Sequence, residues 1–154
     1  MALTGIFTGL GVEAFQSLLR SVSMGKLRTY QLFERVKARA GLTKLNSENL
    51  RKAAPRLWSR LEQGEEEVAQ DLAQAILVSN LEMIAAVLDF LGIPHEDGFF
   101  AKEMDASPYL GEGWQQRVFE QFKEQYPEPA LLFYVNHLGW ELQRQEQLFR
   151  PAAA

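Results

Sequence analysis

The stretch from Glu65 to Leu91 limits the possible fold more than any other part of the chain, because it is apolar around most of a helical circumference. A helix of that kind is buried on several sides. Glu65, Glu66 and Glu67 stand where negative charge favours the positive end of a helix dipole. Gly92 and Pro94 then stop the helix. These signals predict one continuous helix of roughly 40 Å, around which the other segments must pack.

A membrane span is the competing interpretation of this stretch. Asp71, Glu82 and Asp89 interrupt it, so no run of about 20 apolar residues survives. We therefore expect a protein without a membrane-spanning helix. Asn80, the remaining polar residue near the middle, is expected to be a hydrogen-bonded amide in the core or in an interface, not a ligand-binding group.

Length and composition indicate one domain in a reducing compartment. The chain has 154 residues, which suits one domain with a core that needs no covalent staples. It contains no cysteine, which excludes disulfides, thiolate catalysis and zinc sites with cysteine ligands. The N-terminus lacks the basic region of a secretory signal. A cytoplasmic location is the expectation that follows.

The net charge of −4 hides a strong asymmetry along the chain. Residues 1–60 carry eleven Lys and Arg against three acids, a net charge of +8. Residues 61–154 carry five Lys and Arg against seventeen acids, a net charge of −12. Asymmetry of this size is informative about partners, or about docking of the two parts on each other, and not about the fold.

Helical periodicity recurs along the chain and strand signals are nearly absent, so the sequence predicts an all-α, single-domain bundle of about six helices around the long buried helix. Residues 1–11 form an N-terminal arm held by its apolar side chains, and residues 150–154 a frayed tail. Besides the central helix, the expected helices cover residues 12–23, 26–40, 47–53, a restart with Pro55 in its first turn, 114–126, and 129 to about 148.

The region 93–113 shows little periodicity and contains several Gly and Pro residues, so we expect a long ordered loop. Aromatic side chains argue against disorder there. Phe99, Phe100, Tyr109 and Trp114 could line a pocket or a partner surface, although core packing is the simpler interpretation.

Two histidines raise the possibility of a metal or acid–base site. His95 and Asp97 belong to a polar cluster in the loop, and His137 and Glu141 share one face of the last helix because they are four residues apart. A composite metal site would combine these four residues. The simpler interpretations are a solvated turn at His95 and an ordinary side-chain pair at His137. No cofactor is predicted.

The basic first third suggests a nucleic-acid interface. Its candidate phosphate contacts are Lys37, Arg39, Lys44, Arg51 and Lys52. The simpler alternative is that these basic helices dock on the acidic part of the chain, within one molecule or across a dimer.

No known catalytic motif occurs in the sequence: it lacks a G-x-S-x-G elbow, a Walker loop and a G-x-G-x-x-G turn. The favoured expectation is a non-enzymatic helical protein–protein interaction module that associates with itself through complementary charge and exposed aromatics. The alternatives are a small metal-binding protein or enzyme that uses the loop of residues 93–113, and a nucleic-acid-binding regulator that uses the basic helices of residues 26–60.

Overall fold

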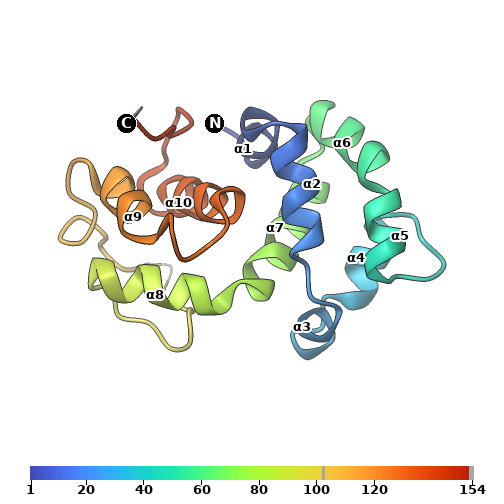
Figure 1. Ribbon diagram of the computed structural model, residues 1–154, viewed down its shortest axis with the longest axis horizontal. Coiled ribbons are helices and arrows are strands. Elements are labelled where there is room, and N and C mark those ends of the chain that lie inside the picture. The colour runs from blue at the N-terminus through green and yellow to red at the C-terminus, as the bar shows by residue number, and fades with distance from the viewer. Residues whose placement is uncertain (102, 153–154) are drawn as a thin grey trace. The chain divides into compact units, whose positions relative to one another are not determined.

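The computed structural model describes residues 1–101 and 103–152, and all the regular structure within these ranges is helical apart from one isolated bridge between Glu96 and Phe99. The all-α class is confirmed (Figure 1). The described residues form ten helices, where about six were expected, and these are α1 Leu3–Leu10, α2 Val12–Arg20, α3 Met24–Thr29, α4 Phe33–Arg39, α5 Ser47–Lys52, α6 Ala54–Glu62, α7 Glu66–Ser79, α8 Leu81–Leu91, α9 Trp114–Phe122 and α10 Glu128–Gln143.

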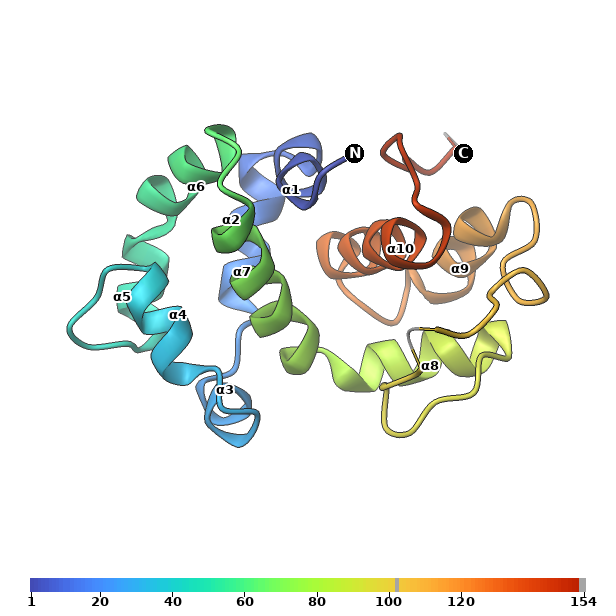
Figure 2. The same cartoon turned by 180° about the vertical axis from the view of Figure 1, so that it is seen from behind.

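Contacts between helices divide the chain into two compact units. The sequence predicts one domain. One unit comprises residues 2–80 and holds α1 to α7. The other comprises Met1 and residues 81–154 and holds α8, α9 and α10 (Figure 2). We call them the 2–80 unit and the 81–154 unit.

The core of the 2–80 unit lies where α1, α2, α6 and α7 meet. Phe15 on α2 is 1% exposed, and its ring lies 5.7 Å from that of Phe7 and 5.5 Å from that of Trp58. Residues 1–11, expected as an arm, instead form the helix α1, because Leu3, Ile6 and Phe7 recur at helical spacing and are all buried. The expectation that apolar side chains hold this segment is correct.

Helix α1 takes its N-terminal cap from a residue far away in the sequence. Ala2 offers no capping side chain, and the first amides of the helix would otherwise lack acceptors. The carboxylate of Glu66 at the start of α7 accepts hydrogen bonds from Leu3 N at 3.1 Å and from Thr4 N at 2.8 Å. Its negative charge also lies at the positive end of the α1 dipole. Glu66 therefore ties α1 to α7.

The continuous helix expected over residues 65–91 is wrong, because α7 ends at Ser79 and α8 begins at Leu81. Asn80 lies between them with φ −126° and ψ 31°, outside the helical region. Its side chain donates to Ile76 O at 2.7 Å, and the Ser79 hydroxyl donates to Ala75 O at 2.7 Å. Such side-chain bonds to the preceding turn compete with continuation of the helix. Asn80 is nevertheless a hydrogen-bonded amide, as expected.

The helix expected over residues 26–40 is also divided. Helix α3 ends in a Schellman motif in which Leu32 N donates to Leu27 O at 2.8 Å and Gln31 N donates to Arg28 O at 3.2 Å. Gln31 occupies the left-handed position with φ 61°. Glycine usually takes that position, so the sequence carried no visible stop signal there.

The predicted starts of α5 and α6 are confirmed. Asn46 caps α5, since its side-chain oxygen accepts from Asn49 N at 2.7 Å. Pro55 lies in the first turn of α6, where its missing N–H removes no helical hydrogen bond. The helices expected over 12–23, 114–126 and from 129 are present, although α10 ends at Gln143 and not near 148.

The loop of residues 93–113 connects α8 to α9 and is held by buried side chains at Ile93, Ala106 and Leu110. Within it, Asp97 and Gly98 both have positive φ and form a tight turn beneath the Glu96–Phe99 bridge. No single helix in the described ranges is long and apolar enough to cross a membrane, and α7 and α8 satisfy the length and hydropathy criteria only when they are taken as a pair.

Candidate functional site

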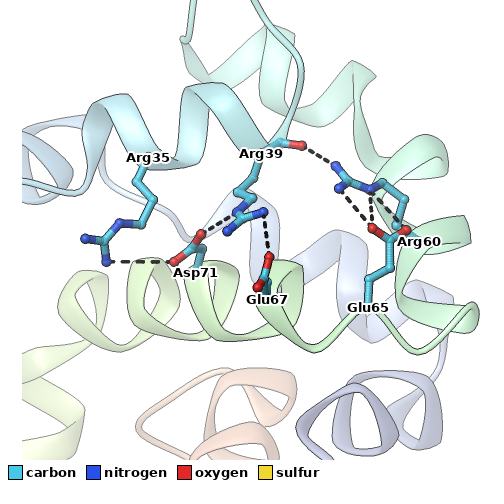
Figure 3. A network of polar contacts seen from close by, with 6 residues as sticks. All are labelled: Arg35, Arg39, Arg60, Glu65, Glu67 and Asp71. Atoms are coloured by element: carbon cyan, nitrogen blue, oxygen red, sulfur yellow. Dashed lines mark hydrogen bonds and ion pairs between the residues drawn. The ribbon is translucent and has the colours of Figure 1, made fainter.

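A network of arginines and acids joins α4 and α6 to α7 (Figure 3). Arg39 Nε donates to Asp71 Oδ2 at 2.6 Å, and Arg35 Nη1 lies 3.8 Å from the other carboxylate oxygen. Arg39 Nη1 also lies 3.4 Å from Glu67 Oε2. The hydrogen bond to Asp71 is the main reason that the pKa of Arg39 is raised above its usual value. Basic residues of α4 thus dock on acids of α7.

Helix α6 joins the same network through Arg60. Its Nη2 lies 3.0 Å from Glu65 Oε1, and its Nη1 donates to Arg39 O at 2.7 Å. The carbonyl of Arg39 is near the C-terminus of α4, where a cation is favourable. The simpler interpretation of the basic third, docking on acidic residues of the same chain, therefore describes these arginines.

Three of the five residues predicted to contact nucleic acid are paired with carboxylates. Arg39 belongs to the network, Lys37 Nζ lies 3.5 Å from Glu34 and Lys52 Nζ lies 3.2 Å from Glu48. The other two, Lys44 and Arg51, are exposed side chains of the 2–80 unit. A nucleic-acid interface stays a prediction. Arg39 is the least suitable of the five to contact phosphates, because it is held against the acids of α7.

His95 is bonded to α8 and to its own loop, and its partners do not include the side chain of Asp97. Its Nε2 lies 2.7 Å from Asp89 Oδ1 at the end of α8, and its Nδ1 accepts a hydrogen bond from Gly98 N at 3.0 Å. An accepting Nδ1 requires that the proton of neutral histidine is on Nε2, where it is donated to the Asp89 carboxylate. The histidine thus clamps the tight turn of residues 96–99 onto α8. Asp97 is an exposed residue at the left-handed position of that turn.

His137 and Glu141 meet on one face of α10, as their spacing predicts. His137 Nδ1 lies 3.5 Å from Glu141 Oε2, and the imidazole ring lies between Phe133 and Trp140 at 5.9 Å and 5.5 Å. Over the described ranges, no three His, Asp or Glu side chains come together to hold a metal ion. The composite metal site stays a prediction for which these residues offer no set of three ligands.

Tyr134 lies on the same helix with its hydroxyl buried. No hydrogen-bond partner for that hydroxyl exists within the described part of the chain. Burial raises the pKa of Tyr134 far above its usual value near 10, and the charge of Glu141 raises it further. A buried hydroxyl without a partner is destabilising, because its hydration is lost without replacement.

Tyr134→Phe is therefore expected to raise the free energy of unfolding by about 1 kcal/mol at neutral pH. The folded-state pKa of Tyr134 is higher than that of the unfolded chain, so the native state retains a proton that the unfolded chain releases. This contribution to stability is present below pH of about 10 and is lost as the pH rises above that value. Urea unfolding should show that the Tyr134→Phe variant exceeds the natural chain in free energy of unfolding by more at alkaline pH than at neutral pH. A less stable variant at neutral pH would mean that the hydroxyl has a partner.

A cavity of about 360 Å³ opens at the start of α9, and Trp114 is one of its walls. Trp114 is only 4% exposed, so core packing, the simpler interpretation, describes most of its side chain. Trp114 Nε1 donates to Gln143 Oε1 at 3.0 Å, and Gln143 Nε2 donates to Leu110 O at 3.2 Å. Phe149, which follows the end of α10, forms another wall. Phe99, in contrast, is 48% exposed, and Phe100 and Tyr109 are half-buried.

Sequence reasoning missed the amide network beside this cavity. Asn136 on α10 is fully buried and bonded to Gln145 and Phe149. One signal was visible in advance: Gly139, an unfavourable residue inside a helix, implies that something approaches closely. The neighbours are the side chains of Gln145 and Gln115, which a Cβ at Gly139 would meet.

Comparisons with models of known protein families, with curated proteins and with solved structures find no significant match.

Proposed function

We propose that this protein is a non-enzymatic helical interaction module that associates with copies of itself. The observation that carries the proposal is the opposite charge of its two units. The 2–80 unit has eleven Lys and Arg against eight acids, a net charge of +3, and residues 81–154 have five against twelve, a net charge of −7. Opposite charges on two surfaces of one chain attract between copies and accelerate their encounter.

Several basic side chains of the 2–80 unit are available for such a contact. The acids of α7 hold Arg35, Arg39 and Arg60, which leaves exposed side chains elsewhere in the unit. The exposed basic side chains outside the network with α7 include Arg20, Lys26, Arg28, Lys44 and Arg51.

The 81–154 unit supplies aromatic surface beside its acids. Phe90 is 42% exposed and Phe99 is 48% exposed, and large exposed aromatics are enriched at protein interfaces. The ring of Phe90 lies 5.6 Å from that of Phe122, which in turn lies 5.9 Å from that of Tyr126. Asp89, beside Phe90 in the sequence, has a side chain that is 76% exposed. Exposed aromatic side chains on a unit with a net negative charge fit a basic surface of a second copy.

The test is the molar mass in solution as a function of salt. Size-exclusion chromatography with light scattering should give a dimer or larger species at low salt, and salt should dissociate it because exposed charges are screened. Charge reversal by Lys44→Glu with Arg51→Glu, and removal of an aromatic by Phe90→Ala, should each lower the association constant at least several-fold.

Val12→Ala is a matched control for Phe90→Ala, because Val12 is also an exposed apolar residue, at 41%, but lies on the 2–80 unit outside this aromatic surface. It should leave the association constant unchanged. A strict monomer at high concentration and low salt contradicts the proposal. Titration with duplex DNA in the same buffers tests the alternative, since binding there with a steep salt slope would favour a nucleic-acid partner.

A further inference from the structure

Residues 145–152, which we call the C-terminal segment, lie on α9 and α10 as a bound peptide would. Asn136 of α10 contacts both main-chain groups of one residue of the segment. Its Oδ1 accepts from Phe149 N at 2.7 Å, and its Nδ2 donates to Phe149 O at 3.2 Å and to Leu132 O at 2.9 Å. A neighbouring β-strand pairs with a residue through the same two groups. Asn136 is 0% exposed, so its position is set by the helix core.

Further amides hold both ends of the segment. At one end, Gln145 Nε2 donates to Asn136 Oδ1 at 2.8 Å, and Gln115 Nε2 donates to Gln145 Oε1 at 2.6 Å. At the other end, Ala152 N donates to Gln116 Oε1 at 2.9 Å. Fraying of residues 150–154 stays a prediction, and residues 153 and 154 lie outside the described residues. We call Gln115, Gln116 and Asn136 the docking amides.

Polar contacts dominate the attachment of the segment. None of its residues is buried, and Leu148, Phe149 and Pro151 are only half-buried. Apolar area removed from water is what makes an element costly to detach. The segment is therefore at the low-stability end of the 81–154 unit, where local opening is easiest.

The residue that joins the segment to α10 stores backbone strain. Arg144 has φ 51° and ψ 43°, the left-handed conformation, which is unfavourable for a residue with a Cβ. Detachment of the segment frees Arg144 to leave that conformation. Strained connections of this kind favour exchange of an element between identical chains.

Once the segment has detached, the surface of α9 and α10 that carries the docking amides would bind another peptide main chain. When the segment leaves, Asn136 keeps its bond to Leu132 O and loses those to Gln145 and Phe149. The Oδ1 of Asn136 would then have lost both of its donors, which is unfavourable for a buried acceptor. The atoms that satisfy it are main-chain groups and a glutamine amide, and the same segment of another copy supplies all of them.

We propose that two copies of this chain exchange their C-terminal segments, each segment docking on the Asn136 of the other copy. This inference rests on the proposed self-association and gives it a structural route. Residues 144–149 span at most about 20 Å when extended. The two docking surfaces must then lie close together, as they do around a two-fold axis.

Single cysteines test the exchange, because the natural chain has none. Gln116→Cys and Ala152→Cys are made in separate samples, which are mixed, incubated at low salt and treated with a short bismaleimide. The Gln116 side chain contacts Ala152 N, so a cross-link between these positions reports docking of one copy's segment on the other copy. Mass spectrometry of the digested product should identify the mixed cross-link.

Phe149→Pro, placed in the Ala152→Cys chain, is the decisive variant. It removes the N–H that Asn136 accepts and leaves the helices untouched, so the mixed product should decrease at least tenfold. Glu146→Ala, a change at an exposed residue of the same segment, should leave the yield unchanged.

The same samples are examined by light scattering, which separates the two proposals. A dimer whose mixed product does not exceed that of the Phe149→Pro sample would overturn the exchange and leave self-association intact. A monomer without mixed product would overturn both.

Discussion

Replacing Phe15 with alanine is expected to lower the free energy of unfolding by about 3–5 kcal/mol, the largest effect among the changes considered for this chain. Phe15 is 1% exposed, and its ring is in contact with Phe7 on α1 and Trp58 on α6. The variant loses buried apolar area and leaves a cavity that three helices cannot close without moving. Urea unfolding followed by circular dichroism measures the change.

Phe90→Ala is the matched control for that experiment. Its ring is 42% exposed and has an edge contact with Phe122, so about 1 kcal/mol is expected. Equal losses for Phe15 and Phe90 would show that α2 does not lie at the centre of the 2–80 unit.

Asp71→Ala should cost about 2 kcal/mol. The side chain of Asp71 is 10% exposed and accepts the 2.6 Å hydrogen bond from Arg39, with Arg35 nearby. Removing the carboxylate leaves the guanidinium groups of Arg35 and Arg39 without the anion that both contact, so that they repel each other. The loss stays below that of a deeply buried pair because Arg39 retains solvent contact and can still reach Glu67. Thermal or urea unfolding at moderate salt is the measurement.

Glu67→Ala uses the same arginine as an internal comparison. Its side chain is 80% exposed, and exposed ion pairs contribute little, so a loss below about 0.5 kcal/mol is expected. Equal losses for Asp71→Ala and Glu67→Ala would contradict the idea that burial of the carboxylate makes the Asp71–Arg39 pair the more stabilising one.

Helix ends were predictable from the sequence where glycine makes them. Gly41 and Gly92 are each followed by a hydrophobic residue, and both helices end in a Schellman motif, with Leu42 N bonded to Lys37 O and Ile93 N bonded to Leu88 O. Gln31 takes the same left-handed position without being glycine, so the sequence contains no marker for it. The prediction failed there because tertiary packing outweighed local preference.

The break at Asn80 shows a different limit. Asparagine and serine are tolerated inside helices when their side chains face solvent, so their presence alone does not end one. Here Ser79 Oγ also accepts from Ser23 N at 2.9 Å, and Asn80 Nδ2 lies 3.4 Å from Ser21 Oγ. These partners come from residues almost 60 positions away, which periodicity within a short window cannot detect.

The docking of charged helices could be predicted from the sequence, whereas the hydrogen bonds of the buried amides could not. The docking of basic helices on acids was one of the stated alternatives, because net charge is visible in a sequence. The partners of Asn136 were not predictable, since an asparagine in a helix gives no indication of which distant main chain it will contact. Only Gly139 hinted at that contact.

The carboxylate of Glu66 also affects the order of folding. During synthesis α1 emerges before α7, but the acceptors for Leu3 N and Thr4 N belong to a residue made more than 60 positions later. Short isolated helices are marginal in water. The eight-residue helix α1 is therefore expected to stay unformed or frayed until α7 has been translated, and to become native together with α7 and not in the order of synthesis.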